Sequence, residues 1–315
     1  IDNQNLPQLL TAQIKEQVHI EDDYGSVEMT NEEITVKSIM REEMKIFFHF
    51  ELFSNLKKLS ISQDQHFYPL ESFVVDGFSK LTKLEDLEIK LFKRSIGTTH
   101  LFKAFLQLPL LKRFSLRISF LRNIDWILLI IFLKGQNNLK TLSFGTLESI
   151  LNKSQYFQQN SYLIKLIKCL ENKPHLRYLD LQSEYFSLET LSKGLSQLPM
   201  MVNQLRSLKI TAVDDTITSQ EKPLKRTEGL CNFIKNQRES LKTLHILIRL
   251  AFEDDVITDI AQAISKLTNL RKLDCSIHDF WTQRTEKLLE FFENTLQEDL
   301  PEGSQCGLTS SDVWD

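Results

Sequence analysis

The chain has 315 residues, of which 42% are hydrophobic and 25% charged, with nine glycines and seven prolines. This composition excludes an intrinsically disordered chain and is typical of a folded protein with a large core. A net charge of -4 gives no general attraction to nucleic acid or to an anionic membrane, so we expect neither as a partner.

The cysteines and the longest apolar run indicate in which cellular compartment we expect the protein. The four cysteines lie far apart and form no C-x-x-C pair, which favours a reducing compartment, so we expect a cytoplasmic protein: Cys169, Cys231, Cys275 and Cys306. The longest apolar run covers only residues 127–133, far short of the roughly 20 residues that a membrane-spanning helix needs. We interpret this run as a buried helix face and expect no membrane span.

Residues 1–55 lack the repeated motif of the later chain and are expected to form an amino-terminal cap. Val18-His19-Ile20 alternates as a short strand does. Thr30-Asn31-Glu32-Glu33 has the spacing of a capping box, and the apolar residues from Ile34 onward predict a helix after it. The cap is therefore predicted to hold one strand, which begins a sheet, and one helix, which covers its open end.

A motif of the form L-x-x-L-x-L, with Ile, Phe or Cys at some anchors, recurs eight times between residues 56 and 297. The second and third anchors lie two residues apart, so they share one side of a short strand, while the first anchor packs at the preceding turn. By subtraction, successive copies are 28, 27, 28, 37, 29, 36 and 29 residues apart. The copies begin at Leu56, Leu84, Leu111, Leu139, Leu176, Leu205, Leu241 and Leu270.

Apolar residues spaced three or four apart follow nearly every motif, as in an amphipathic helix. Strands joined by a crossover helix run parallel, so one strand and one helix per repeat predict a single stacked array. Because helices are wider than strands, we expect a curved α/β solenoid with a parallel β-sheet on its concave face and helices on its convex face.

This pattern resembles the leucine-rich repeat family, and its repeat length is similar to that of the ribonuclease-inhibitor-like subfamily. The resemblance covers residues 56–297 and implies a horseshoe of about eight repeats plus caps that binds other proteins. The family usually places Asn or Cys a few residues after each strand, and this chain does not, so we expect irregular turns. The corresponding residues are Asp64, Phe92, Ser119, Leu147, Glu184, Val213, Arg249 and His278.

Two repeats exceed the usual length by about eight residues, at 145–160 and 211–226. Both surpluses fall after the strand and before the helix, and therefore on the same rim of the solenoid. They are either tolerated surface insertions or partner-binding segments, in which case Tyr156, Asp214 and Asp215 are candidate contacts. Residues 298–315 contain acidic residues and no Lys or Arg, and are expected to be a flexible acidic tail.

No catalytic signature is present: the chain has no phosphate-binding loop, no G-x-G-x-x-G, no H-E-x-x-H and no G-x-S-x-G. We therefore predict a protein that is not an enzyme, with no catalytic residues, no metal site and no cofactor.

Strand alternation sends a mixed set of polar side chains to the concave face. Side chains at strand spacing form a grid that suits an extended protein surface better than a small molecule. The residue after the first anchor is basic in seven of the eight copies, which predicts either a row that holds an acidic partner or stems that only cover the rim. The candidate contacts on the concave face are Arg113, Arg117, Tyr178, Asp180, Lys209 and His245.

Three functions remain open from the sequence. The first is an intracellular protein that binds another protein, as an adaptor, a scaffold or a structural subunit of a larger assembly such as a cytoskeletal complex. The second, from relatives with similar repeats, is a regulator that activates a small GTPase. The third is a substrate receptor of a ubiquitin ligase, because Leu6-Pro7 with Leu10 and Ile14 resembles the start of an F-box. The partner's identity and the oligomeric state are not predicted.

Overall fold

In a computed structural model, the described residues form twelve strands, β1–β12, and the helices α3–α8. The chain divides into two compact units, Ile1–Ser149 and Ile150–Asp315. The structure describes residues 18–22, 25–30, 32–37, 55–63, 78, 80–91, 98–108, 110–118, 121–146, 153–213, 223–250, 254–279 and 305–308.

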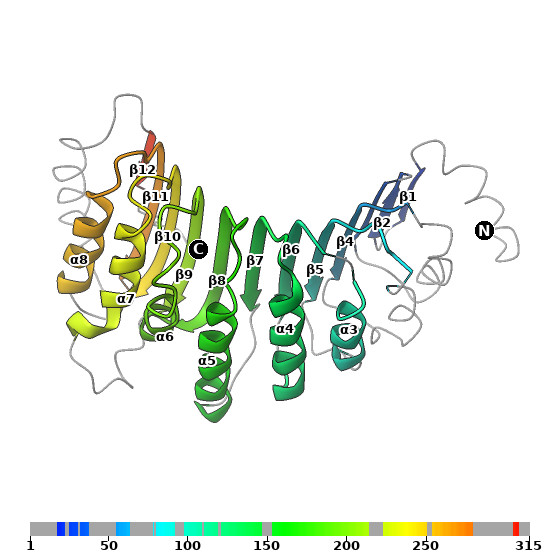
Figure 1. Ribbon diagram of the computed structural model, residues 1–315, viewed down its shortest axis with the longest axis horizontal. Coiled ribbons are helices and arrows are strands. Elements are labelled where there is room, and N and C mark those ends of the chain that lie inside the picture. Colours follow the sequence, from blue (N-terminus) through cyan, green and yellow to red (C-terminus); the bar gives the residue numbers. More distant parts are fainter. Residues whose placement is uncertain are drawn as a thin grey trace, which may run out of the picture. The chain divides into compact units, whose positions relative to one another are not determined.

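The first unit begins with an antiparallel meander, β1-β2-β3, and continues with strands that run parallel from β3 to β7. Helices lie along one face of this sheet (Figure 1). The elements are β1 Val18–Asp22, β2 Gly25–Met29, β3 Glu33–Lys37, β4 Lys58–Gln63, β5 Asp86–Leu91, α3 Thr98–Phe105, β6 Arg113–Ile118, α4 Asn123–Gly135 and β7 Thr141–Thr146.

The second unit alternates helices with parallel strands from β8 to β12, again with the helices on one face (Figure 1). Its helices pack side by side, α5 on α6, α6 on α7 and α7 on α8. The elements are α5 Lys153–Lys168, β8 Tyr178–Ser187, α6 Leu188–Leu195, β9 Ser207–Val213, α7 Pro223–Lys235, β10 Thr243–Leu250, α8 Asp254–Ile264, β11 Lys272–Asp279 and β12 Gln305–Leu308.

The repeat anchors form the core, as the motif predicts. Every anchor of the eight copies is buried, and Leu84, Leu111 and Leu139, which begin successive copies, are at most 1% exposed. The second anchors pair across neighbouring strands, for example Leu87 with Phe114 and Phe114 with Leu142. Each coil therefore adds one layer to a continuous core, and the α/β leucine-rich repeat solenoid is confirmed as the fold class.

Within the described residues, the residue after the first anchor fixes the start of the next strand in six of the copies. Its carbonyl accepts two backbone N–H groups from the following coil: Lys57 O accepts from Glu85 N at 2.8 Å and Asp86 N at 2.9 Å. The same pair of bonds recurs at Glu32, Glu85 and Lys112 in the first unit and at Arg177, Arg206 and Lys242 in the second. These strand-start residues are thus held at the spacing of the strands, about 4.8 Å.

The amino-terminal cap confirms the predicted strand at Val18 but not the predicted helix start at Thr30. Thr30 Oγ1 accepts the N–H of Glu33 at 2.9 Å, as in a capping box, but it closes a turn between two strands. Glu33–Lys37 forms β3 because its backbone pairs in parallel with β4, with Ile34 opposite Leu59, and the buried Ile34 side chain extends the core of the repeats. The rest of the predicted helix, in residues 38–54, lies outside the described residues.

The apolar run at 127–133 forms part of α4, but it is buried on one side only. Trp126, Leu129 and Phe132 are buried, whereas Ile127 is 43% and Ile131 50% exposed. A helix that packs on one neighbouring layer buries one stripe at 3.6-residue spacing, so the run contributes a buried helix face, as predicted, and leaves its other side exposed.

The two longer repeats differ from the predicted loops. Residues 153–160 of the first surplus belong to α5, and in the second β9 continues to Val213 and α7 begins at Pro223. The described parts of the two surpluses therefore lie in helices and strands. In the predicted acidic tail, Gln305–Leu308 forms β12 and pairs in parallel with β11, because an edge strand has unpaired backbone groups to offer.

No helix within the described residues is long and apolar enough to cross a membrane. Cys169, Cys231 and Cys275 are buried cysteines. Burial raises the pKa of Cys231 to about 12, so this thiol stays protonated and unreactive in the folded protein.

Candidate interaction surface

One face of each sheet carries no helices, and its side chains are polar. On β5 and β6 the side chains alternate between buried anchors and half-buried or exposed polar residues. We call this side of each unit the helix-free face. Because the strands are in register, its side chains form rows that run across the strands, one residue from each strand.

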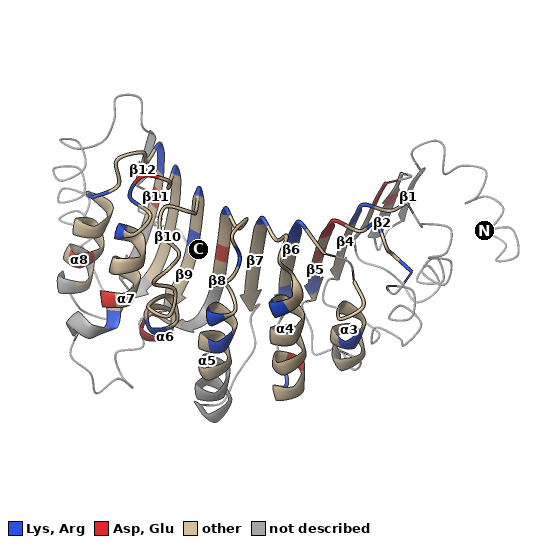
Figure 2. Ribbon diagram, viewed as in Figure 1, with Lys and Arg blue, Asp and Glu red and all other residues tan. Residues whose placement is uncertain are grey.

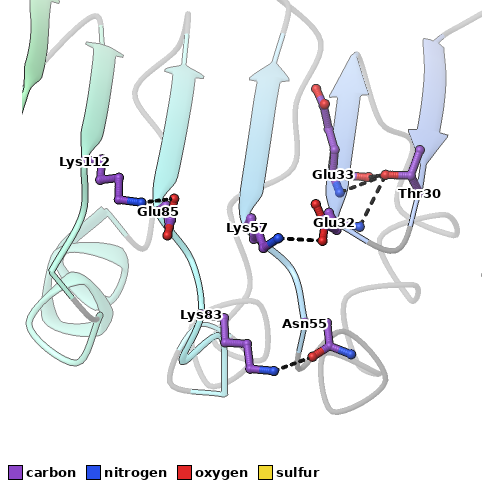
Figure 3. A network of polar contacts seen from close by, with 8 residues as sticks. All are labelled: Thr30, Glu32, Glu33, Asn55, Lys57, Lys83, Glu85 and Lys112. Atoms are coloured by element: carbon purple, nitrogen blue, oxygen red, sulfur yellow. Dashed lines mark hydrogen bonds and ion pairs between the residues drawn. The ribbon is translucent and has the colours of Figure 1, made fainter.

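In the first unit the strand starts from Glu32 to Lys112 alternate in charge, as Figure 3 shows, and a second basic residue, Lys140, follows Lys112. Lys57 Nζ lies 2.6 Å from Glu32 Oε1, and Lys112 Nζ lies 2.6 Å from Glu85 Oε2. The hydrogen bond to Glu32 raises the pKa of Lys57, and the hydrogen bond from Lys112 lowers the pKa of Glu85. From Glu32 to Lys112 the acidic and basic side chains compensate each other.

The first row on the helix-free face repeats this alternation one residue further along each strand. Lys58 forms an ion pair with Glu33, and Arg113 Nε lies 3.5 Å from Asp86 Oδ2. Burial raises the pKa of Asp86 above its usual value, although Arg113 and Lys58 act in the opposite direction. Acidic dipeptides on β3 and β5 therefore face basic dipeptides on β4 and β6.

The next row of the first unit centres on Glu88. Its carboxylate accepts from Ser60 Oγ at 3.2 Å and lies 2.8 Å from Lys90 Nζ. Burial raises the pKa of Glu88, but the contacts with Lys90, Ser60 and Arg117 outweigh burial, and the pKa lies below its usual value. This carboxylate is charged at neutral pH.

In the second unit one row of the helix-free face joins four strands. Asp180 pairs in register with Lys209, Lys209 with His245, and His245 with Asp274. His245 Nδ1 lies 2.6 Å from Asp274 Oδ2, and Gln182 Nε2 donates to Asp180 Oδ1 at 2.6 Å. The row thus has an acidic residue at each end and a lysine and a histidine between them. Tyr178, which is 46% exposed, lies beside the row on β8.

The strand-start row of the second unit is basic throughout. Figure 2 shows Lys or Arg at the starts of β8, β9, β10 and β11. Arg177 Nη1 donates to the carbonyls of Pro174 and Leu176 at 2.8 Å and 2.9 Å. No carboxylate among the described residues forms an ion pair with Arg206, Lys242 or Arg271, and all three side chains are exposed.

The residues predicted as partner contacts fall into three groups. Asp180, Lys209 and His245 lie together in one row, with Tyr178 on the same face of β8. Arg113 and Arg117 lie on the helix-free face of the first unit, four residues apart on β6. Tyr156 lies in α5, in the helical layer and not in a loop, and Asp214 and Asp215 lie outside the described residues.

Asp180 is the one acidic residue among the contacts predicted on this face, and the other acidic residues of the surface were not predicted as contacts. Asp274, Glu88 and the dipeptide Glu85-Asp86 each pair with a basic or imidazole side chain on a neighbouring strand or on their own strand. Their signal was the alternation of charge at equivalent positions of successive repeats. Within the described part of the chain, no cluster of three or more His, Cys, Asp or Glu side chains is placed to hold a metal ion.

Comparisons with known proteins assign no family to this chain. No protein-family model matches the chain, and no curated protein matches it in sequence. A solved structure that matches is a chain from the Toll–Spatzle complex, described as a molecular hub in Drosophila development and innate immunity. It is 8% identical, with a TM-score of 0.30, and the match covers 92% of this chain and 57% of that chain. This chain therefore spans just over half the length of the Toll-complex chain.

Proposed function

We propose that this chain binds another protein through its helix-free faces and performs no chemistry. The observation that carries the proposal is the ordering of the polar rows. Side chains such as Asp180, Lys209 and His245 are held in register on parallel strands, and their main chains are fixed by the sheet. A partner meets a surface that is already organised, which lowers the entropy lost on binding.

The composition of this face favours a protein partner over a small molecule. Rows of half-exposed charged and aromatic residues at a pitch of about 4.8 Å present a broad grid, whereas small-molecule sites are concave and mostly apolar. Tyr178, 46% exposed, and Arg113, also exposed, are residue types enriched among interface hot spots. We propose Arg113, Arg117, Tyr178, Asp180, Lys209 and His245 as contacts, and an adaptor or structural subunit in a reducing compartment as the role.

The test is affinity purification of the tagged chain from cell extract, followed by mass spectrometry. The same experiment with Arg113→Ala and Tyr178→Ala together is expected to lose the partner bound by the unmodified chain. The matched control is Lys103→Ala with Met200→Ala, because both residues are exposed away from the helix-free faces. Equal partner recovery from all three chains would refute the proposed surface.

The identity of the captured partner decides between the roles. A small GTPase whose nucleotide hydrolysis the chain accelerates would replace the adaptor role by a regulatory one. Co-purification with a ubiquitin-ligase adaptor would favour a substrate receptor instead. A partner of neither kind, lost only with the surface variant, supports the proposed interaction module.

A further inference from the structure

We infer that the strand-start row of the second unit, Arg177, Arg206, Lys242 and Arg271, binds an acidic segment of a protein partner. The inference rests on the proposed function, which it deepens by naming the chemistry of the partner and a second contact area. The row lies at the amino-terminal ends of β8, β9, β10 and β11, directly before the first residues of the helix-free face.

The comparison between the two units carries the inference. At the same repeat position, the first unit has Lys57, Glu85, Lys112 and Lys140, preceded by Glu32 in the cap, and Lys57 and Lys112 each have a glutamate at 2.6 Å. The second unit places only basic residues there, and the described residues give Arg206, Lys242 and Arg271 no carboxylate partner. At this position Lys57 and Lys112 of the first unit each have an acidic partner, whereas the described residues give three of the four basic residues of the second unit none.

The backbone holds these charges together. Arg206 O accepts from Lys242 N at 2.9 Å, and Lys242 O accepts from Arg271 N at 2.9 Å. Neighbouring strand starts are therefore about 4.8 Å apart, and like charges at this spacing repel one another. Exposed side chains relieve part of the repulsion by spreading into solvent, and an anionic ligand along the row relieves it further. Lys272, exposed and next to Arg271, adds to the positive end of the row.

The neighbouring surface favours an acidic protein segment over a nucleic acid. Asp180 and Asp274 lie three residues further along β8 and β11, so a phosphodiester chain that crossed the edge would meet carboxylates. A protein segment can present carboxylates to the row and basic or neutral side chains to Asp180 and Asp274. Four strand starts span about 14 Å, and alternate side chains of an extended peptide are about 6.7 Å apart, so two or three carboxylates fit the row.

The test uses the full chain and a fluorescein-labelled peptide of alternating glutamate and serine, measured by fluorescence anisotropy at low ionic strength. The double variant Arg206→Ser with Lys242→Ser is expected to bind this peptide about fivefold more weakly, because it lacks two exposed ion-pair partners. The matched control, Lys57→Ser with Lys112→Ser, removes the same net charge at the same repeat positions in the first unit. It is expected to change the affinity by less than about twofold.

Three outcomes would overturn the inference: no binding of the peptide, equal losses in both double variants, or tighter binding of an oligothymidylate that depends on the same two residues. Circular dichroism and urea unfolding of both variants establish that loss of binding is not loss of fold. Partner capture separates this inference from the proposed function. If Arg113→Ala with Tyr178→Ala loses the partner and Arg206→Ser with Lys242→Ser retains it, binding through the helix-free face is supported. The inferred role of the basic row is then refuted.

Discussion

Two buried glutamines stabilise the turns before the strands. Gln136 Oε1 accepts the N–H of Leu111 at 2.7 Å, and Gln237 Oε1 accepts the N–H groups of Gln204 and Leu205, both at 2.9 Å. Gln237 Nε2 also donates to the carbonyl of Met201. The family's usual Asn or Cys ladder after the strand is missing from this sequence. At these two coils, side-chain amides satisfy the backbone on the opposite edge of the repeat.

At the same scale, Gln237→Ala should be among the most destabilising polar substitutions in the chain. It removes the partner of three backbone groups, and each buried unpaired group costs about 1–3 kcal/mol. We expect the free energy of unfolding to fall by about 3–5 kcal/mol in urea titrations. Gln262→Ala, an exposed glutamine in α8, is the control and should change it by less than about 0.5 kcal/mol.

Two carboxylates on β5 predict opposite responses to pH. The pKa of Glu88 is lowered in the folded state, so its contribution is present above the unfolded pKa and is lost as pH falls through the folded pKa. The pKa of Asp86 is raised by burial, so the folded state is favoured as pH falls through that value. The stability difference between the unmodified chain and Glu88→Gln should therefore shrink from pH 7 to pH 3. The free energy of unfolding of the unmodified chain minus that of Asp86→Asn should rise over the same range, and parallel pH profiles of the two differences would contradict at least one assignment.

At the scale of elements, two glycines set how closely the helices of the second unit pack. A Cβ on Gly229 of α7 would lie 2.1 Å from the backbone carbonyl oxygen of Ser192 in α6. A Cβ on Gly194 of α6 would meet the terminal Cδ1 of Ile167 in α5 at 2.5 Å. The first neighbour is backbone and the second is the flexible end of a side chain, so the two positions differ in how much they tolerate.

Gly229→Ala should consequently destabilise the protein more than Gly194→Ala. Overpacking against backbone costs about 1–3 kcal/mol or more, and the gain of up to about 1 kcal/mol in helix propensity offsets only part of it. We expect a net loss of about 2 kcal/mol for Gly229→Ala and a change within about 1 kcal/mol for Gly194→Ala. Thermal or urea unfolding of the two variants measures this difference, and equal effects would show that α6 and α7 can separate freely.

The strands also show how much of the fold the sequence predicts. The strands β4–β11 were predictable because each repeat places its anchors two residues apart, and every anchor is buried. The strand β3 was not, because Thr30 and Glu33 have the spacing of a capping box and only pairing with β4 makes their segment extended. Local sequence signals describe a turn well, but the neighbouring strand decides which element follows it.

At the scale of the whole molecule, the distribution of charge distinguishes the two units. The basic candidates for binding were visible in the sequence, since their positions follow from the repeat phase. Whether an acidic side chain neutralises each of these charges was not visible, because that depends on which strands are neighbours. Lys112 is next to Glu85, whereas Arg206 is next to Arg177 and Lys242. The same residue type at the same repeat position therefore has a different electrostatic role in each unit.

This difference predicts opposite effects of two equivalent double substitutions on stability. At about 20 mM salt, where charges interact over about 20 Å, Lys57→Ser with Lys112→Ser removes attractive pairs and should lower the free energy of unfolding. Arg206→Ser with Lys242→Ser relieves repulsion in the basic row and should raise it. At about 1 M salt the screening length falls to about 3 Å, and both differences should approach zero. Urea titrations of the three chains at the two salt concentrations make this comparison. If the second double variant destabilised the protein at low salt, the strand starts of the second unit would have to be compensated in the folded chain.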